Sequence, residues 1–104
     1  MDTRAFSFRV RVYYEDTDAA GVVYYANYLR YLERARTEWL RSFGFSQALL
    51  LQDAGIVFTV VSLEIEYRRS ARLDDELTIT CAPRQDGAAS VHFTQCVLLS
   101  LIHI

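Results

Sequence analysis

The chain contains no lysine, and all eleven of its basic residues are arginines. That absence excludes a Schiff-base lysine and the phosphate-binding lysine of a Walker motif. Cysteine and histidine are also scarce, with two of each. They are too few and too far apart for a disulfide framework or a zinc site, so we expect no metal. A single proline and four glycines leave no linker or low-complexity tract.

The length and composition describe one domain. A chain of 104 residues, of which 52% are apolar, can build one core but not two. The net charge of −2 argues against non-specific binding of nucleic acid. No apolar run reaches the ~20 residues of a membrane span, and the N-terminus lacks the basic-then-apolar order of an export signal. We therefore predict a single cytoplasmic domain over residues 1–104, with no nucleic-acid partner and no membrane span.

The first half of the chain has the patterns of one strand and two helices. Apolar and polar residues alternate over 6–13, which indicates a half-buried strand. Apolar positions at helical spacing predict a long helix over 28–43, with Asn27 as a plausible N-cap. Ser46 is a plausible cap for a second, short helix that extends to about Asp53.

The second half of the chain has the period of a sheet. From residue 56 onward, alternation predicts strands at 61–67, at 77–81 and from about 90, with a hairpin turn at 86–87. One long helix on one face of these antiparallel strands gives an α+β domain. The apolar end of the sequence, CVLLSLIHI, would leave an unpaired edge. We therefore expect a truncated or altered C-terminus and at least one further strand to complete the sheet.

The segment EDTDAAGVVYYANY, residues 15–28, carries the chemistry. Its acids Asp16 and Asp18 follow the first strand, and an aromatic run then leads into the long helix. A carboxylate beside a helix start can serve as a base or a nucleophile. The free backbone N–H groups of that helix start can hold a developing oxyanion.

The segment VRVYYEDTDAAGVVYYANYLRYLERARTE resembles the hotdog-fold acyl-CoA thioesterases, in particular the Tol–Pal-associated YbgC branch. The 4-hydroxybenzoyl-CoA thioesterases are more distant relatives. The likeness covers roughly 6–96 and includes the later motifs EY, ARLDD and FTQ. It implies an antiparallel sheet wrapped around one long central helix. It also implies dimers or homotetramers with sites at the subunit interface, and hydrolysis of acyl-CoA thioesters without a metal or redox cofactor.

Matched residue by residue, the resemblance implies that Asp18 is the catalytic carboxylate and that the N–H of Tyr25 polarises the thioester carbonyl. Asp18 would attack the carbonyl directly or deprotonate a water molecule; the alternative is that it only caps the loop. For Asp16 a loop-fixing role is favoured over an acid–base role. Many members of the branch have histidine in place of Tyr25, and members continue for about one more strand.

Several further residues are candidates for substrate contacts. Phenols suit an acyl or pantetheine channel, and arginines suit the phosphates of CoA. Core packing is an equal alternative for two of the tyrosines, N-capping for the asparagine, and pairing with nearby acids for the arginines. A hydroxyl in the second strand would face the thioester across a dimer interface. The candidates are Tyr14, Tyr24, Tyr25, Asn27, Thr59, Arg68, Arg69 and Arg72.

The sequence thus predicts an acyl-CoA thioesterase. One rival is a non-catalytic module that grips acyl-carrier protein or pantetheine thioesters in a membrane-associated lipid-synthesis assembly. A second rival, dehydration of 3-hydroxyacyl thioesters, usually employs a histidine, and none lies in 1–91.

Overall fold

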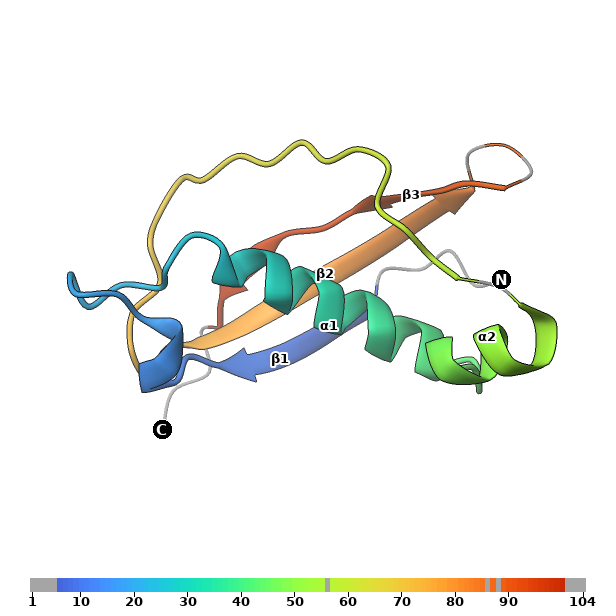
Figure 1. The fold of residues 1–104 in the computed structure, drawn as a ribbon. Coiled ribbons are helices and arrows are strands. Elements are labelled where there is room, and N and C mark those ends of the chain that lie inside the picture. The colour runs from blue at the N-terminus through green and yellow to red at the C-terminus, as the bar shows by residue number, and fades with distance from the viewer. Residues whose placement is uncertain (1–5, 56, 86, 88, 101–104) are drawn as a thin grey trace.

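The computed structural model describes residues 6–55, 57–85, 87 and 89–100. One long helix lies across one face of a small antiparallel sheet (Figure 1). A one-turn 3₁₀ helix and a second, short α-helix lie on either side of the long helix in the chain. The elements in chain order are β1 (Phe6–Arg11), η1 (Tyr14–Asp16), α1 (Asn27–Arg41), α2 (Gln47–Ala54), β2 (Glu76–Gln85), β3 (Val91–Thr94) and β4 (Val97–Leu99).

The strand β2 is the centre of the sheet. Along one edge it pairs antiparallel with β1, in a register that places Phe8 opposite Ile79. Along the other edge the first half of β2 pairs with β4 and its second half pairs with β3, both antiparallel. At the break between these two strands, the N–H of Thr80 donates to the carbonyl oxygen of Cys96 at 2.9 Å. A single return strand, interrupted at residues 95–96, therefore follows β2 along most of its length.

The core lies between α1 and the sheet. The helix buries residues at the spacing of one helical face, including Tyr31 and Ala35. Against them lie Leu77, Ile79 and Cys81, which alternate along β2 and are at most 2% exposed. Complete burial of a leucine or isoleucine side chain contributes roughly 1.5–3 kcal/mol. This packing fixes the start of α1 relative to the loop that follows β1.

The first strand, both helices and the α+β architecture are confirmed. The Ser46 hydroxyl accepts the N–H of Leu49 at 3.1 Å, as an N-cap does, and Gly55 ends α2 with a φ of 68°. The prediction that Asn27 caps α1 is wrong, because Ala26 is the capping residue and Asn27 is the first residue of the helix.

The second strand predicted, at 61–67, is not formed. The segment 57–67 has no strand assignment, and each of its residues is exposed. Figure 1 shows this segment as a strap that passes beside the sheet from α2 to the far end of α1. We refer to 57–67 as the strap. Alternation alone cannot make a strand, because a strand also requires a hydrogen-bonded neighbour.

The predicted third and fourth strands are confirmed as β2 and the β3–β4 return. Of the predicted hairpin turn, Asp86 lies outside the described residues, and Gly87 has a positive φ of 85°. The last four residues of the predicted apolar end, 101–104, also lie outside the description. Within the described part of the chain, neither helix is both long and apolar enough to cross a bilayer.

Candidate active site

The loop after β1 turns back on itself at Asp18. The Asp18 N–H donates to the carbonyl oxygen of Val22 at 2.9 Å, and the Asp18 carbonyl accepts the N–H of Gly21 at 3.0 Å. Gly21 has a φ of 79°, which glycine adopts without strain. Aspartate and glycine are favoured at the first and fourth positions of such turns. The sequence DAAG therefore encodes a tight turn that presents Asp18 at its start.

The carboxylate of Asp18 is exposed in the single chain. Its Oδ1 accepts the N–H of Ala20 at 2.8 Å, which is the loop-capping bond considered as the alternative role. The carboxylate also lies near Tyr24. The pKa of the Tyr24 phenol is raised, first by the phenol of Tyr25 and to a smaller extent by the negative charge of Asp18. The charge of Asp18 thus acts on the aromatic run that leads into α1.

Asp16 and Asn27 join the loop to the helix. The Asp16 carboxylate is buried and accepts the N–H of Tyr13 at 2.9 Å. Its carbonyl oxygen accepts the N–H of Tyr24 at 2.9 Å and the Nδ2–H of Asn27 at 2.8 Å. The loop-fixing role of Asp16 is therefore confirmed. Burial and the nearby Asp16 carboxylate raise the pKa of the Tyr31 phenol, which lies in the core beside this junction.

Among the residues with described positions, two backbone donors at the start of α1 have no partner. The carbonyl oxygen of Tyr24 accepts the N–H of Asn27 at 2.8 Å. Because C=O and N–H point in opposite directions in a trans peptide, the N–H of Tyr25 points away from the helix. Within the described residues, neither the N–H of Tyr25 nor that of Ala26 donates a hydrogen bond. These donors lie at the positive end of the helix dipole and are suited to bind an oxyanion.

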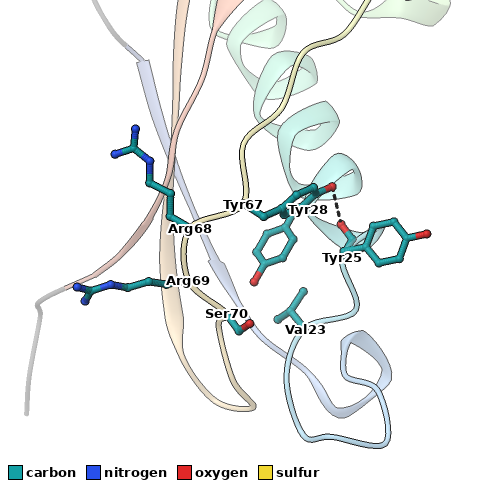
Figure 2. A pocket seen from close by; sticks show the side chains of 7 residues that line it. All are labelled: Val23, Tyr25, Tyr28, Tyr67, Arg68, Arg69 and Ser70. Carbon is teal, nitrogen blue, oxygen red and sulfur yellow. Dashed lines mark hydrogen bonds between the residues drawn. The ribbon is translucent and has the colours of Figure 1, made fainter.

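A pocket of about 180 Å³ opens beside this helix start. Figure 2 shows it between the first turn of α1 and the residues that follow the strap. The hydroxyl of Tyr67 donates to the carbonyl oxygen of Tyr25 at 3.3 Å across it. The guanidinium groups of Arg68 and Arg69 are directed away from the tyrosines. The lining residues are Val23, Tyr25, Tyr28, Tyr67, Arg68, Arg69 and Ser70.

The predicted binding residues divide into two groups. Tyr25, Arg68 and Arg69 line the pocket, whereas the others do not. Asn27 is buried, and its amide is committed to Asp16. The remaining four predicted residues, all exposed, are Tyr14, Tyr24, Thr59 and Arg72.

Pairing of the arginines with nearby acids is found at one position. The Nε of Arg68 lies 3.1 Å from a carboxylate oxygen of Glu66, and both side chains are largely exposed. Such a surface pair contributes at most about 1 kcal/mol. At Arg72 it is the backbone N–H that donates to the Asp75 carboxylate, at 2.9 Å.

No group of three or more potential metal-ligating side chains occurs among the residues for which the structure gives positions.

Four lining residues, Val23, Tyr28, Tyr67 and Ser70, are not among the predicted site residues, and two of them are tyrosines. Tyr28 falls in the predicted helix 28–43 and Tyr67 at the end of the predicted strand 61–67. For Tyr28 the signal in the sequence is compositional, because six of the seven tyrosines fall within 13–31. Tyr67 lies outside this cluster. The site is thus largely a cluster of phenols at the start of α1.

An antiparallel sheet on one long helix, with a carboxylate loop at the helix start, agrees with the hotdog fold that the sequence resemblance implies. The family model described as the thioesterase superfamily matches residues 20–99, and the chain belongs to this superfamily.

Curated relatives and solved structures agree with this assignment. The chain is 50% identical to the acyl-CoA thioesterase YbgC of Haemophilus influenzae over 95 residues, which cover 91% of this chain and 70% of that protein. It is 47% identical to the acyl-CoA thioester hydrolase YbgC of Escherichia coli O157:H7, with 94% and 72% covered. The crystal structure of a probable thioesterase from Bartonella henselae superposes with a TM-score of 0.89 at 37% identity, covering 94% of this chain and 82% of that one.

Proposed function

We propose that this chain hydrolyses acyl-CoA thioesters to a free acid and CoA, with Asp18 as general base or nucleophile and the Tyr25 N–H as oxyanion donor. One observation carries the proposal. This chain belongs to the thioesterase superfamily. Among the described residues, the N–H groups of Tyr25 and Ala26 have no hydrogen-bond acceptor, and they lie beside a loop that presents a carboxylate. The names of the curated relatives support acyl-CoA as the substrate class.

The chemistry requires little beyond these groups. In one route an oxygen of Asp18 attacks the thioester carbon, CoA leaves as a thiolate, and water hydrolyses the resulting anhydride. In the other route Asp18 takes a proton from the water molecule that attacks. In both routes negative charge develops on the carbonyl oxygen, where one well-placed N–H stabilises the transition state by about 3 kcal/mol. Thiolate is a good leaving group, so no strong general acid is needed, and we propose no cofactor.

Recognition of CoA is assigned to the arginines beside the pocket. The diphosphate and 3′-phosphate of CoA suit guanidinium groups, which bind phosphate through paired hydrogen bonds. Arg69 is favoured because it lines the pocket and has no ion pair among the described residues. Arg68 would exchange its exposed contact with Glu66 for a phosphate, and Arg72 is proposed as a further phosphate contact. Thr59 is proposed to face the thioester across a dimer interface.

A second copy of the chain is proposed to complete the site. The Asp18 carboxylate is exposed in the single chain, and general-base catalysis of this kind benefits from exclusion of bulk water. A dimer or homotetramer would supply that cover. A cytoplasmic location and an association with the Tol–Pal system are proposed on the resemblance to the YbgC branch alone.

Thiol release from a panel of acyl-CoA substrates tests the proposal. The panel includes short aliphatic, long aliphatic and aromatic acyl groups, and a thiol-reactive dye reports free CoA. We expect turnover of at least one class. Stoichiometric binding without release of thiol would instead support the alternative, a non-catalytic module for acyl-carrier protein or pantetheine thioesters in a membrane-associated lipid-synthesis assembly.

A further inference from the structure

Tyr67 is tied to the backbone beside the proposed oxyanion donor. Its hydroxyl donates to the carbonyl oxygen of Tyr25 at 3.3 Å (Figure 2). Its ring lies edge-on to the ring of Tyr25, with 6.1 Å between centroids, and 5.7 Å from the ring of Tyr28. Tyr67 therefore contacts the first turn of α1 through both its hydroxyl and its ring.

The backbone that follows Tyr67 is held firmly. The N–H of Ala71 donates to the hydroxyl of Tyr28 at 2.9 Å, in a buried hydrogen bond. The carbonyl oxygen of Ala71 accepts the N–H of Val23 at 2.8 Å. These bonds attach the chain at residue 71 to both α1 and the loop. Tyr67 thus reaches the helix start from a segment anchored four residues away, although the strap itself is exposed.

The hydroxyl of Tyr67 holds one of the two peptide planes that flank the Cα of Tyr25. The plane that contains the Tyr25 N–H is fixed by the 2.8 Å bond from Asn27 to the carbonyl oxygen of Tyr24. The plane that contains the Tyr25 carbonyl is held by the N–H of Tyr28 at 3.3 Å and by the hydroxyl of Tyr67 at 3.3 Å. Both of these bonds are long. The hydroxyl is therefore one of two donors to this plane, which also contains the N–H of Ala26.

We propose that Tyr67 is a positioning residue for thioester hydrolysis, which restrains the backbone of Tyr25, and with it the Tyr25 N–H, by holding the adjacent peptide plane that carries the N–H of Ala26. This inference rests on the proposed function. Its physical basis is that an oxyanion donor acts only when it is already aimed at the place where charge develops. Loss of the Tyr67 hydroxyl would leave the ring packing in place and would leave the N–H of Tyr28 as the one remaining donor to this plane among the described residues.

The substitution Tyr67→Phe removes the hydroxyl and keeps the ring. We expect kcat to fall about tenfold with KM changed less than about twofold, which is a fraction of the effect of deleting an oxyanion donor outright. Tyr13→Phe is the matched control, because it removes an exposed phenol outside the pocket and should leave kcat unchanged. A wild-type kcat for Tyr67→Phe would overturn the proposal.

Binding of two non-hydrolysable CoA analogues separates positioning from a merely structural role. A ketone isostere keeps the carbonyl and replaces sulfur with CH₂, whereas an S-alkyl-CoA thioether lacks the carbonyl. We expect Tyr67→Phe to weaken the ketone several-fold and to leave the thioether unchanged. Equal weakening of both analogues, or a lower melting temperature that accounts for the loss of activity, contradicts the proposal. If the wild type releases no thiol, the proposed function fails, and the contrast between the analogues still tests Tyr67.

Discussion

The junction of loop and helix, residues 12–32, and the strap, 57–67, differ sharply in how they are held. In the junction Val12 is fully buried and Tyr31 is 1% exposed. The N–H, the carbonyl oxygen and one carboxylate oxygen of Asp16 are hydrogen-bonded. In the strap every residue is exposed, and Val61 is 94% exposed. Both segments are rich in apolar residues. Composition therefore does not explain the difference.

Hydrogen-bonded neighbours explain it. The junction lies between β1 and α1, and the segment 71–75 closes it with backbone bonds such as that from Val12 to Asp75 at 2.9 Å. The strap has the alternation of a strand, but no backbone hydrogen bond joins it to a strand of the described residues. One region is thus complete within the chain, and the other presents an edge with unpaired backbone groups and apolar side chains.

The largest effect is expected at the junction, from Asp18→Asn. The substitution keeps the shape of the side chain and its capacity to accept the N–H of Ala20, but removes the charge and the basicity. We expect kcat for thioester hydrolysis to fall by about 10²–10⁴-fold. Affinity for the product CoA should change little, because the carboxylate acts on the thioester. Thiol release and calorimetric binding of CoA measure the two quantities.

The matched control for this variant is Asp53→Asn, which removes an exposed carboxylate from α2, away from the pocket. It should retain full activity. Wild-type turnover by Asp18→Asn would remove Asp18 from the chemistry and leave it as a residue of the turn.

Two truncations test the difference between the packed junction and the exposed strap. One is in β2, against which the junction packs, and the other is in the strap. Ile79→Ala opens a cavity where β2 packs against the junction helix, and should lower the free energy of unfolding by about 2–5 kcal/mol. Val61→Ala removes exposed methyl groups from the strap and should cost less than about 0.5 kcal/mol. Urea unfolding at a fixed protein concentration measures both. A loss at Val61 that approaches the loss at Ile79 would mean that the strap is packed in solution by another molecule.

The same contrast separates what could be predicted from the sequence. Periodicity was sufficient for β1, α1 and β2, because each turns one face toward the core, as Ala35 and Ile79 do. The helix α2 buries no residue, and its signal in the sequence is the N-cap Ser46. Periodicity failed for the strap. The alternation from Val61 to Tyr67 indicates a segment suited to a sheet, but it does not supply the neighbouring strand. The position of Asp18 was predictable because the turn is encoded locally by aspartate and glycine.

The contacts that assemble the site could not be predicted in this way. The bond from Asn27 to Asp16 spans eleven residues, and the bond from Tyr67 to Tyr25 spans 42. An asparagine before a helix has the local signal of an N-cap, and that signal gave the wrong role here. Only the packing of α1 against the loop determines that the Asn27 amide faces the Asp16 carbonyl.

A smaller effect is expected from Asn27→Ala. The substitution leaves the carbonyl of Asp16 with one donor fewer in a buried site, which costs about 1–3 kcal/mol of unfolding free energy. Activity should fall through kcat, because the loop that presents Asp18 loses a restraint. The matched control is Gln47→Ala, which removes an exposed hydrogen bond from the Gln47 side-chain amide to the hydroxyl of Thr37 and should cost less than about 0.5 kcal/mol. A rise in KM without loss of stability would instead make Asn27 a substrate contact.

The smallest effect tests how well the sheet excludes water where Cys81 packs against Trp39 and Leu40 in the second half of α1. Burial raises the pKa of the Cys81 thiol from 9.0 to about 11. Between these two values the unfolded chain loses the proton and the native chain keeps it, so stability falls as pH rises. Raising the pH from 9 to 10 should cost about 1 kcal/mol through this group. Urea unfolding of the wild type and of Cys81→Ala at both pH values isolates the contribution. Equal losses in the two proteins would show that the Cys81 thiol titrates as it does in water. Solvent would then reach a side chain that is fully buried in the structure.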